Sequence, residues 1–489
     1  MITMEKTFAT KDWVFLFLCL LLGILAEETL LRGKIGISYL VFITAFYGVF
    51  FWRFRGFSFS HQRFGYLLLC CIWLLAAGYF INDNILFQVL NMLVIPALAI
   101  AHLAVVTSPK NLNWNQFAFL HYLFTKLLGV FKYVGESAGV IGKGVKRGVD
   151  EDKLLIWKKV LIGVLISIPI LAVVLRLLMS ADTQFERMIG GIPNWFLVID
   201  MENFIRLLVV LFLTAAFFSY MQVLLKKHIQ VLKQQDHAEG FKIDAIITVT
   251  FLVLINLVYV LFTVVQFKYF FSGTLQSDYT YAEYARKGFF ELLFVTMFNL
   301  SVTVIVLTFV DRSLTGLKMM TQVLLTLLVG SSFVMLSSAF MRLSMYEEAY
   351  GFTFTRVLVH SFMLFLVFIL VYTLVKIWME KLSIFHFYFI ASLIYYTAIA
   401  VIDLDRFVVK KNIERYEATE KIDVHYLNSL SYTGVQGLIE LYEKHPAIEG
   451  LGPIIQDRKQ EAVSADNPWQ SYNLAREQAY KELRNFDLK

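Results

Sequence analysis

Residues 342–356, RLSMYEEAYGFTFTR, carry the side chains best suited to binding chemistry. The stretch holds two arginines, two adjacent glutamates and two tyrosines, and it lies between two long apolar runs. Guanidinium groups form paired hydrogen bonds with carboxylates and phosphates, and these bonds strengthen where water is partly excluded. The stretch therefore indicates either a loop between membrane helices or a site for an anionic group.

Two further segments are polar in the same way: residues 277–293, SDYTYAEYARKGFFELL, and residues 403–416, DLDRFVVKKNIERY. We expect arginines and glutamates of the three segments, Glu348 included, to pair in one partly desolvated cluster that docks the C-terminal region or holds an anionic head group. The candidate residues are Tyr284, Arg286, Glu291, Arg342, Tyr346, Glu347, Tyr350, Arg356, Asp403, Asn412 and Arg415.

A plainer alternative stays open, because tyrosine and arginine are common anchors where a helix leaves the membrane. Gly351 can end one helix, and Thr353 can cap the next. Asp403 and Asp405 could bind a divalent cation, but an acid at a helix start is more often a cap or an ion-pair partner. Interfacial anchoring does not explain the acids, so the binding hypothesis is retained.

The composition places these segments in a membrane protein. Of 489 residues, 58% are hydrophobic, 16% aromatic and 17% charged, which is too apolar for a soluble chain. The apolar runs do not alternate and are long enough to cross a bilayer, so the predicted fold is an all-α integral membrane protein. We expect spans near residues 13–30, 35–52, 64–81, 85–106, 155–179, 203–225, 243–267, 288–310, 319–338, 357–375 and 384–402.

The distribution of basic residues predicts the orientation. With the N-terminus in the cytoplasm, the inner loops hold 20 lysines and arginines and the outer loops hold 8. Eleven spans then place the C-terminus, and all three polar segments, outside a bacterial cytoplasmic membrane. The predicted regions are an N-terminal four-helix region (1–106), a cytoplasmic interfacial segment (107–154), a seven-helix membrane core (155–402) and a soluble helical tail (403–489).

The interfacial segment contains residues 115–147, which are apolar but are interrupted by His121, Lys126 and Lys132. This pattern is typical of an amphipathic helix lying on the membrane surface, with its aromatic rings in the bilayer and its lysines among anionic head groups. The tail differs, because it holds 12 basic and 15 acidic residues and no run long enough to span. Its apolar residues recur every three or four positions, which predicts two or three amphipathic helices.

The polar residues expected within the spans are Arg176, Asn256, Asn299 and His360. Asparagines in membrane helices form hydrogen bonds between helices worth about 0.6 kcal/mol each, and His360 is more often such a contact than a ligand. The sequence has none of the usual hydrolase, zinc-protease or nucleotide-binding motifs. Cys19, Cys70 and Cys71 all lie in apolar runs, where a thiol behaves as a small hydrophobe. We therefore expect no cofactor and no metal.

Four ordered motifs carry a family resemblance: YAEYARKGFFELL, RLSMYEEAYGFTFTR, NIERY with KIDVHYLNSLS, and WQSYNLAREQA. With them, the chain resembles the bacterial polytopic membrane proteins grouped as the domain of unknown function numbered 4173, which is related to the one numbered 4153. The resemblance covers residues 150–489 and implies a membrane location. It implies no activity.

These observations favour a non-enzymatic membrane protein that binds a lipid or another envelope membrane protein at its outer face, in sensing or assembly. They do not favour nucleic acid, because the basic residues are spread over loops. One alternative is a transporter or lipid flippase, which would use Asn256 or His360. The other is a membrane-bound transferase acting on a lipid-linked substrate, with Glu291 or Asp403 as the base.

The predicted topology can be tested with a reporter enzyme that is active only outside the cytoplasm. Fused after residue 489 it should be active, and inserted near residue 230 it should be silent. An inactive C-terminal fusion that is expressed at normal levels would place the tail inside and separate the three polar segments.

Overall fold

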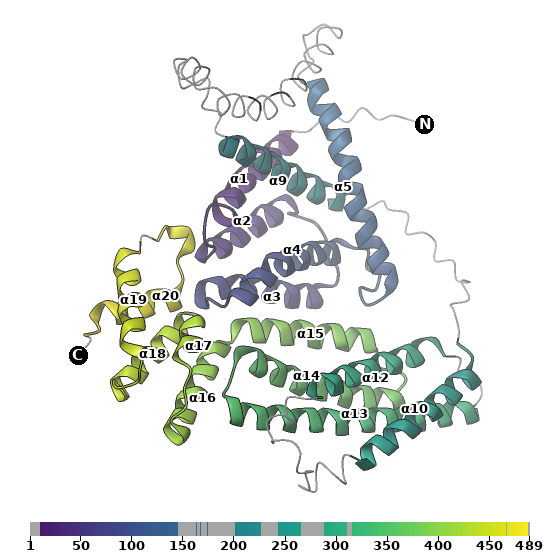
Figure 1. Cartoon of the computed structure of the whole chain (residues 1–489). Coiled ribbons are helices and arrows are strands. Elements are labelled where there is room, and N and C mark those ends of the chain that lie inside the picture. Colours follow the sequence, from purple (N-terminus) through teal and green to yellow (C-terminus); the bar gives the residue numbers. More distant parts are fainter. Residues whose placement is uncertain are drawn as a thin grey trace. The chain divides into compact units, whose positions relative to one another are not determined.

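The protein is helical throughout the part of the chain that its computed structural model describes, residues 10–144, 201–225, 243–265, 288–310, 315–465 and 467–487, with Gly163, Ser167 and Val174 (Figure 1). The helices before residue 350 are α1 (Thr10–Leu30), α2 (Ile37–Arg53), α3 (Gln62–Ile81), α4 (Ile85–Thr107), α5 (Phe117–Gly144), α9 (Met201–Leu225), α10 (Ala245–Val265), α12 (Phe289–Phe309) and α13 (Thr315–Tyr350). Those after it are α14 (Phe354–Trp378), α15 (Ile384–Val401), α16 (Leu404–Thr419), α17 (Val424–Ser429), α18 (Tyr432–Lys444), α19 (Leu451–Ser464), the 3₁₀ turn η2 (Trp469–Ser471) and α20 (Leu474–Asn485).

Nine of the helices in the described residues are long and apolar enough to cross a membrane, which confirms the predicted class of fold. They are α1, α3, α4, α9, α10, α12, α13, α14 and α15, and each coincides with a predicted span. The predicted span at 35–52 corresponds to α2, which is apolar but shorter. The one at 155–179, with Arg176, lies outside the described residues except for Gly163, Ser167 and Val174.

The chain forms two compact units whose limits differ from the predicted regions. The first comprises residues 1–79, 95–229 and 467–472, and the second comprises residues 80–94, 230–466 and 473–489. The short tail segment around η2 therefore belongs to the first unit, where the Tyr472 carbonyl accepts a hydrogen bond from the Ile37 amide at 3.0 Å. The rest of the tail belongs to the second unit. The four predicted regions are continuous in sequence, whereas each compact unit combines separate stretches of the chain. The sequence alone does not indicate on which of these stretches the tail packs.

The first unit is built on the packing of α1 against α9 and α2 and of α5 against α9. Arg53 binds Asp12 at 2.5 Å and Gln222 at 3.1 Å, which links three of these helices. In α5, Lys126 is buried and donates to the Val223 carbonyl at 2.9 Å. The expectation that this lysine lies among lipid head groups was wrong, because its ammonium bonds to a backbone carbonyl of α9.

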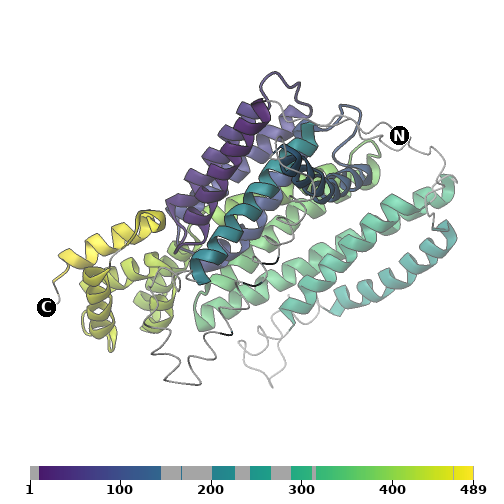
Figure 2. The same ribbon diagram turned by 90° about the horizontal axis from the view of Figure 1, so that it is seen from above.

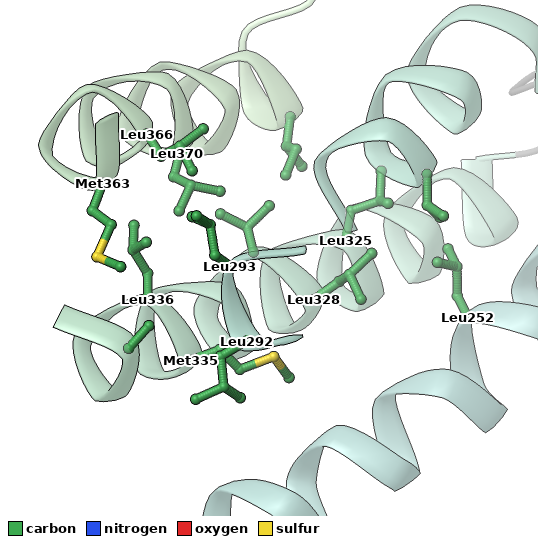
Figure 3. Packing of buried hydrophobic residues seen from close by; sticks show 14 of the residues in the cluster. Leu252, Leu292, Leu293, Leu325, Leu328, Met335, Leu336, Met363, Leu366 and Leu370 are labelled. Carbon is green, nitrogen blue, oxygen red and sulfur yellow. The ribbon is translucent and has the colours of Figure 1, made fainter. Parts of the chain in front are cut away.

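The second unit contains a bundle in which α12 packs on α13, α13 on α10 and α14, and α14 on α15. Leucine, valine and methionine side chains fill its centre. Figure 3 shows Leu292 and Leu293 of α12 beside Met335 and Leu336 of α13, with Met363 of α14 close by. These side chains shed no water on packing within a bilayer, so close van der Waals contact and interhelical hydrogen bonds hold the bundle.

One helix of this bundle is much longer than a membrane requires. With 36 residues, α13 is about 54 Å long, whereas about 20 residues cross the roughly 30 Å hydrocarbon layer. The polar residues of the stretch 342–356 therefore lie mainly on the last turns of α13 and not in a loop. The helix ends at Gly351, which has φ +87°, and the Gly351 amide donates to the Glu347 carbonyl at 2.8 Å. Thr353 then caps α14, so both predicted boundary residues are confirmed.

The tail helices α16 to α20 lie at the same end of the bundle as the α13–α14 turn, and α16 packs on α14 (Figures 1 and 2). They have their own buried core, in which Leu427, Leu438, Leu441 and Ile455 are almost fully enclosed. Asp403, Asp423 and Asn473 cap α16, α17 and α20. The tail is thus a small helical domain with its own hydrophobic centre.

Gly437 offers a direct test of this core, because a Cβ there would lie 2.2 Å from Val409 Cγ1 of α16. Gly437→Ala should lower the thermal stability of the tail in detergent by about 1–3 kcal/mol, and Val409→Ala should restore part of the loss. Gly330→Ala is the matched control, since nothing lies within 4 Å of its Cβ position. Equal protease sensitivity of the tail in the two glycine variants would contradict the packing of α16 on α18.

Candidate functional site

The candidate residues gather at the end of the bundle where α12 begins, α13 gives way to α14, and α15 gives way to α16. Arg342 of α13 is buried, and a Cβ on Gly288, the residue before α12, would lie 3.3 Å from its Nη1. Asn412 and Arg415 of α16 reach the α13–α14 turn. Within the second unit, the three predicted segments therefore meet at one end. Tyr284 and Arg286 lie outside the described residues.

Arg415 binds the end of α13. Its guanidinium donates to the carbonyls of Glu348 at 3.2 Å and Ala349 at 2.9 Å, and also to the Lys421 carbonyl at 3.2 Å. The last carbonyls of a helix have no partner within the helix, and the negative end of the helix dipole attracts a cation. Arg415 thus satisfies two exposed carbonyls of α13 with one charged side chain.

Asn412 and Tyr426 bind the backbone just after α13. The Asn412 amide donates to the Phe352 carbonyl at 2.8 Å and accepts from the Phe352 amide at 3.1 Å. The Tyr426 hydroxyl accepts from the Phe354 amide at 2.7 Å. Together with Arg415, these two residues form what we call the tail clamp. Its five bonds to residues 348–354 all run to backbone groups, which are the polar groups that a helix end leaves unsatisfied.

The α13–α14 turn is also closed from within. Arg356 donates to the Gly351 carbonyl, and its guanidinium lies 4.2 Å from the centre of the Tyr346 ring. Tyr346 in turn packs against Tyr350, with ring centres 4.9 Å apart. Arg356 therefore stabilises the turn through a carbonyl and an aromatic face. This differs from the predicted arginine–glutamate pairing, because the turn offers a carbonyl within closer reach.

The acids of the candidate set occupy three different environments. Glu347 is buried, whereas Glu348 is exposed. Glu291 is also exposed, in the first turn of α12, where a carboxylate is stabilised by the helix dipole without a buried partner. Asp403 caps α16 through the Arg406 amide and accepts from the Thr433 hydroxyl at 2.7 Å.

Glu347 pairs with His360 across the α13–α14 contact, with Oε2 3.0 Å from Nδ1. The other ring nitrogen, Nε2, lies 3.3 Å from the Phe340 carbonyl. Nε2 also lies 3.5 Å from the Ser344 hydroxyl, so the imidazole of α14 contacts three polar groups of α13. From the sequence we predicted Glu347 to lie in the polar cluster at the membrane surface and His360 to lie within a span.

Asp405, predicted as a possible cation ligand or, more often, a cap or ion-pair partner, is a buried acid of the tail. Asn84, between α3 and α4, donates to it at 3.2 Å. Burial raises the pKa of Asp405 above its usual value, although nearby Ser431 and Asn84 act in the opposite direction. A short polar segment, NDN at 82–84, was the available sequence signal, but nothing in the sequence linked it to a residue more than 300 positions later.

The two asparagines within the spans do form interhelical contacts. Asn256 of α10 donates to the Leu324 carbonyl of α13 at 3.0 Å. Asn299 of α12 donates to the Ser332 hydroxyl at 3.1 Å and accepts from Tyr259 at 2.8 Å. These bonds join α10, α12 and α13 near the middle of the bundle. Within the described residues, no group of three or more His, Cys, Asp or Glu side chains is placed to hold a metal ion.

The fold defines a helical multi-pass membrane protein with a helical domain at one end of a membrane bundle. A family model described as a domain of unknown function, DUF4153, matches residues 69–441. The match covers well over half of the chain, so the protein belongs to this family. No curated protein and no solved structure matches it.

The family match begins nearer the N-terminus than the resemblance found at residues 150–489. It begins within α3 and ends within α18, so the family region includes part of the first four spans, where no motif was recognised. The motif WQSYNLAREQA lies beyond its end. The match is to the family numbered 4153, the relative of the one that the motifs resemble.

The contact between Glu347 and His360 can be measured by a double-mutant cycle. Glu347→Gln and His360→Gln should couple by about 0.5–3 kcal/mol in thermal unfolding, because both substitutions remove the same contact. Glu348→Gln is the matched control, since its side chain is exposed. Additive effects for Glu347 and His360, equal to those for Glu348 and His360, would contradict the pairing.

Proposed function

We propose that the protein is a non-enzymatic membrane protein of the bacterial cell envelope. It would hold its tail domain rigidly at the outer face of the cytoplasmic membrane, where the domain recognises a binding partner. The tail domain would bind another envelope protein or a lipid, in sensing or assembly. The observation that carries this proposal is the tail clamp. A domain with its own core, fixed to the bundle by five bonds, has the rigidity that a recognition surface requires.

The surroundings of Asp403 and Glu347 support a binding role for these two acids over catalysis. A general base must be free to accept a proton from a substrate within hydrogen-bond reach. Both carboxylate oxygens of Asp403 already accept bonds, from the Arg406 amide and the Thr433 hydroxyl. Glu347 lies buried against His360. Asp403 therefore caps α16, and Glu347 forms a contact between α13 and α14. The outer location rests on the excess of basic residues in the opposite set of loops.

A transporter is the second candidate, and the buried Glu347–His360 pair is the observation that favours it. Ionisable residues between membrane helices often mark proton or ion pathways. The pair joins the last turns of α13 to the first turns of α14, whereas carriers usually bind near the midplane, where this bundle has Asn256 and Asn299. Solute or lipid movement in proteoliposomes that stops with His360→Gln would favour transport.

The proposed function can be tested in living cells with a photo-crosslinking residue on the tail. Placed at the exposed Glu449, it should give a discrete adduct that weakens strongly in a clamp variant, Asn412→Leu with Arg415→Met. Placed at the exposed Leu261 of α10, it should give none of that adduct. An adduct that is equally strong with the clamp broken, or that forms equally at Leu261, would contradict a role for the fixed tail.

A further inference from the structure

A groove runs along the tail domain between α16, α18 and α20, with a volume of about 690 Å³. Its two sides carry opposite charge. Arg406 and Lys410 line it from α16, whereas Glu440 and Glu443 line it from α18 and Glu482 from α20. Between these rims lie the apolar residues Val409, Ile439 and Phe486. The groove is therefore divided into a basic side and an acidic side.

The basic side chains are available to a ligand. The Arg406 side chain is 69% exposed, and its contact with Asp403 is 3.8 Å long. Lys410 is 74% exposed and lies 4.0 Å from Glu414. Exposed ion pairs of this length contribute little free energy, so both cations can turn toward a bound anion at small cost.

The acidic side chains are similarly accessible. Glu440 is 55% exposed and pairs with Lys444 at 3.0 Å, while Glu482 accepts from Gln436 at 3.0 Å. Glu443 is exposed. Three carboxylates on neighbouring helices repel one another in water, and a cation between them relieves that repulsion. The acidic side thus suits a ligand with an ammonium group.

The order of the two charges relative to the membrane follows from the layers of the tail. α16 lies directly on the end of the bundle, through Asn412, Arg415 and the Asn84–Asp405 contact. α18 packs on α16 through Gly437 and Val409, and α20 packs on α18. Arg406 and Lys410 therefore belong to the helix that packs on the end of the bundle, and the acids belong to the two helices that follow it in the packing. Packed helices lie about 8–10 Å apart, a gap that long side chains can bridge.

We propose that this groove binds the head group of an aminophospholipid of the phosphatidylethanolamine type, with the phosphate at Arg406 and Lys410 and the ammonium at Glu440, Glu443 and Glu482. The phosphate of such a lipid lies next to the hydrocarbon layer, and its primary ammonium extends outward and donates hydrogen bonds to carboxylates. Only two residues separate the end of the membrane helix α15 from the start of α16, so the basic pair lies near the head-group layer. This inference rests on the proposed function, because it names a ligand for the tail domain.

Purified full-length protein in mixed-lipid nanodiscs tests the proposal, with lipid retention read by native mass spectrometry. Phosphatidylethanolamine should be retained about five-fold more than phosphatidylcholine, whose quaternary ammonium cannot donate, and more than anionic phosphatidylglycerol. Glu440→Gln with Glu443→Gln should abolish the preference over phosphatidylcholine. Arg406→Gln with Lys410→Gln should reduce the retention of both phosphatidylethanolamine and phosphatidylglycerol.

Lys421→Gln with Asp457→Asn is the matched control, because both residues are exposed on the tail outside the groove. Equal retention of the three lipids, or a preference that the groove variants leave unchanged, would overturn the proposal. So would loss of a protein adduct in the groove variants with lipid retention intact, which would assign the groove to a polypeptide. Loss of the lipid preference alone would leave the crosslinking test of the proposed function unaffected.

Discussion

The end of α13 is the constraint on which the second unit depends. A helix that continues to the membrane edge ends in carbonyl groups that lack partners within the helix. Arg415 and Asn412 supply those partners from the tail, and Arg356 supplies one from α14. The main role of the polar residues in this region is therefore to attach the tail to the membrane bundle.

Two positions show how the joint limits the sequence. Gly351 needs its left-handed backbone, and a Cβ there would also lie 2.9 Å from Asn412 Oδ1. The Glu347–His360 pair then fixes α13 against α14 just below the turn. One buried pair and one clamp thus hold the turn from two sides, which leaves the far face of α16 and its neighbours open for recognition. One set of polar residues holds the turn and another remains open for recognition, which explains why charged residues are concentrated at one end of the unit.

Helix ends set by neighbouring residues could be predicted from the sequence. The contact partners of residues far apart in the sequence could not. Gly351 and Thr353 follow from backbone rules that act within a few residues. The span count predicted that the start of α12, the α13–α14 turn and α16 lie on one side of the membrane, which stays a prediction. The partner of Glu347 could not be inferred, because helical periodicity does not specify which neighbouring helix faces a side chain. Tyr426 and Asn84 were missed for the same reason.

Hydrogen–deuterium exchange in nanodiscs tests the tail clamp most directly. The amides of residues 351–354 and those of α16 should be protected in the unmodified protein. In Asn412→Leu with Arg415→Met, both should lose protection together by at least ten-fold, while residues 315–338 of α13 keep theirs. Protection of residues 351–354 that is unchanged in the variant would contradict the account, because the turn would then be held without the tail.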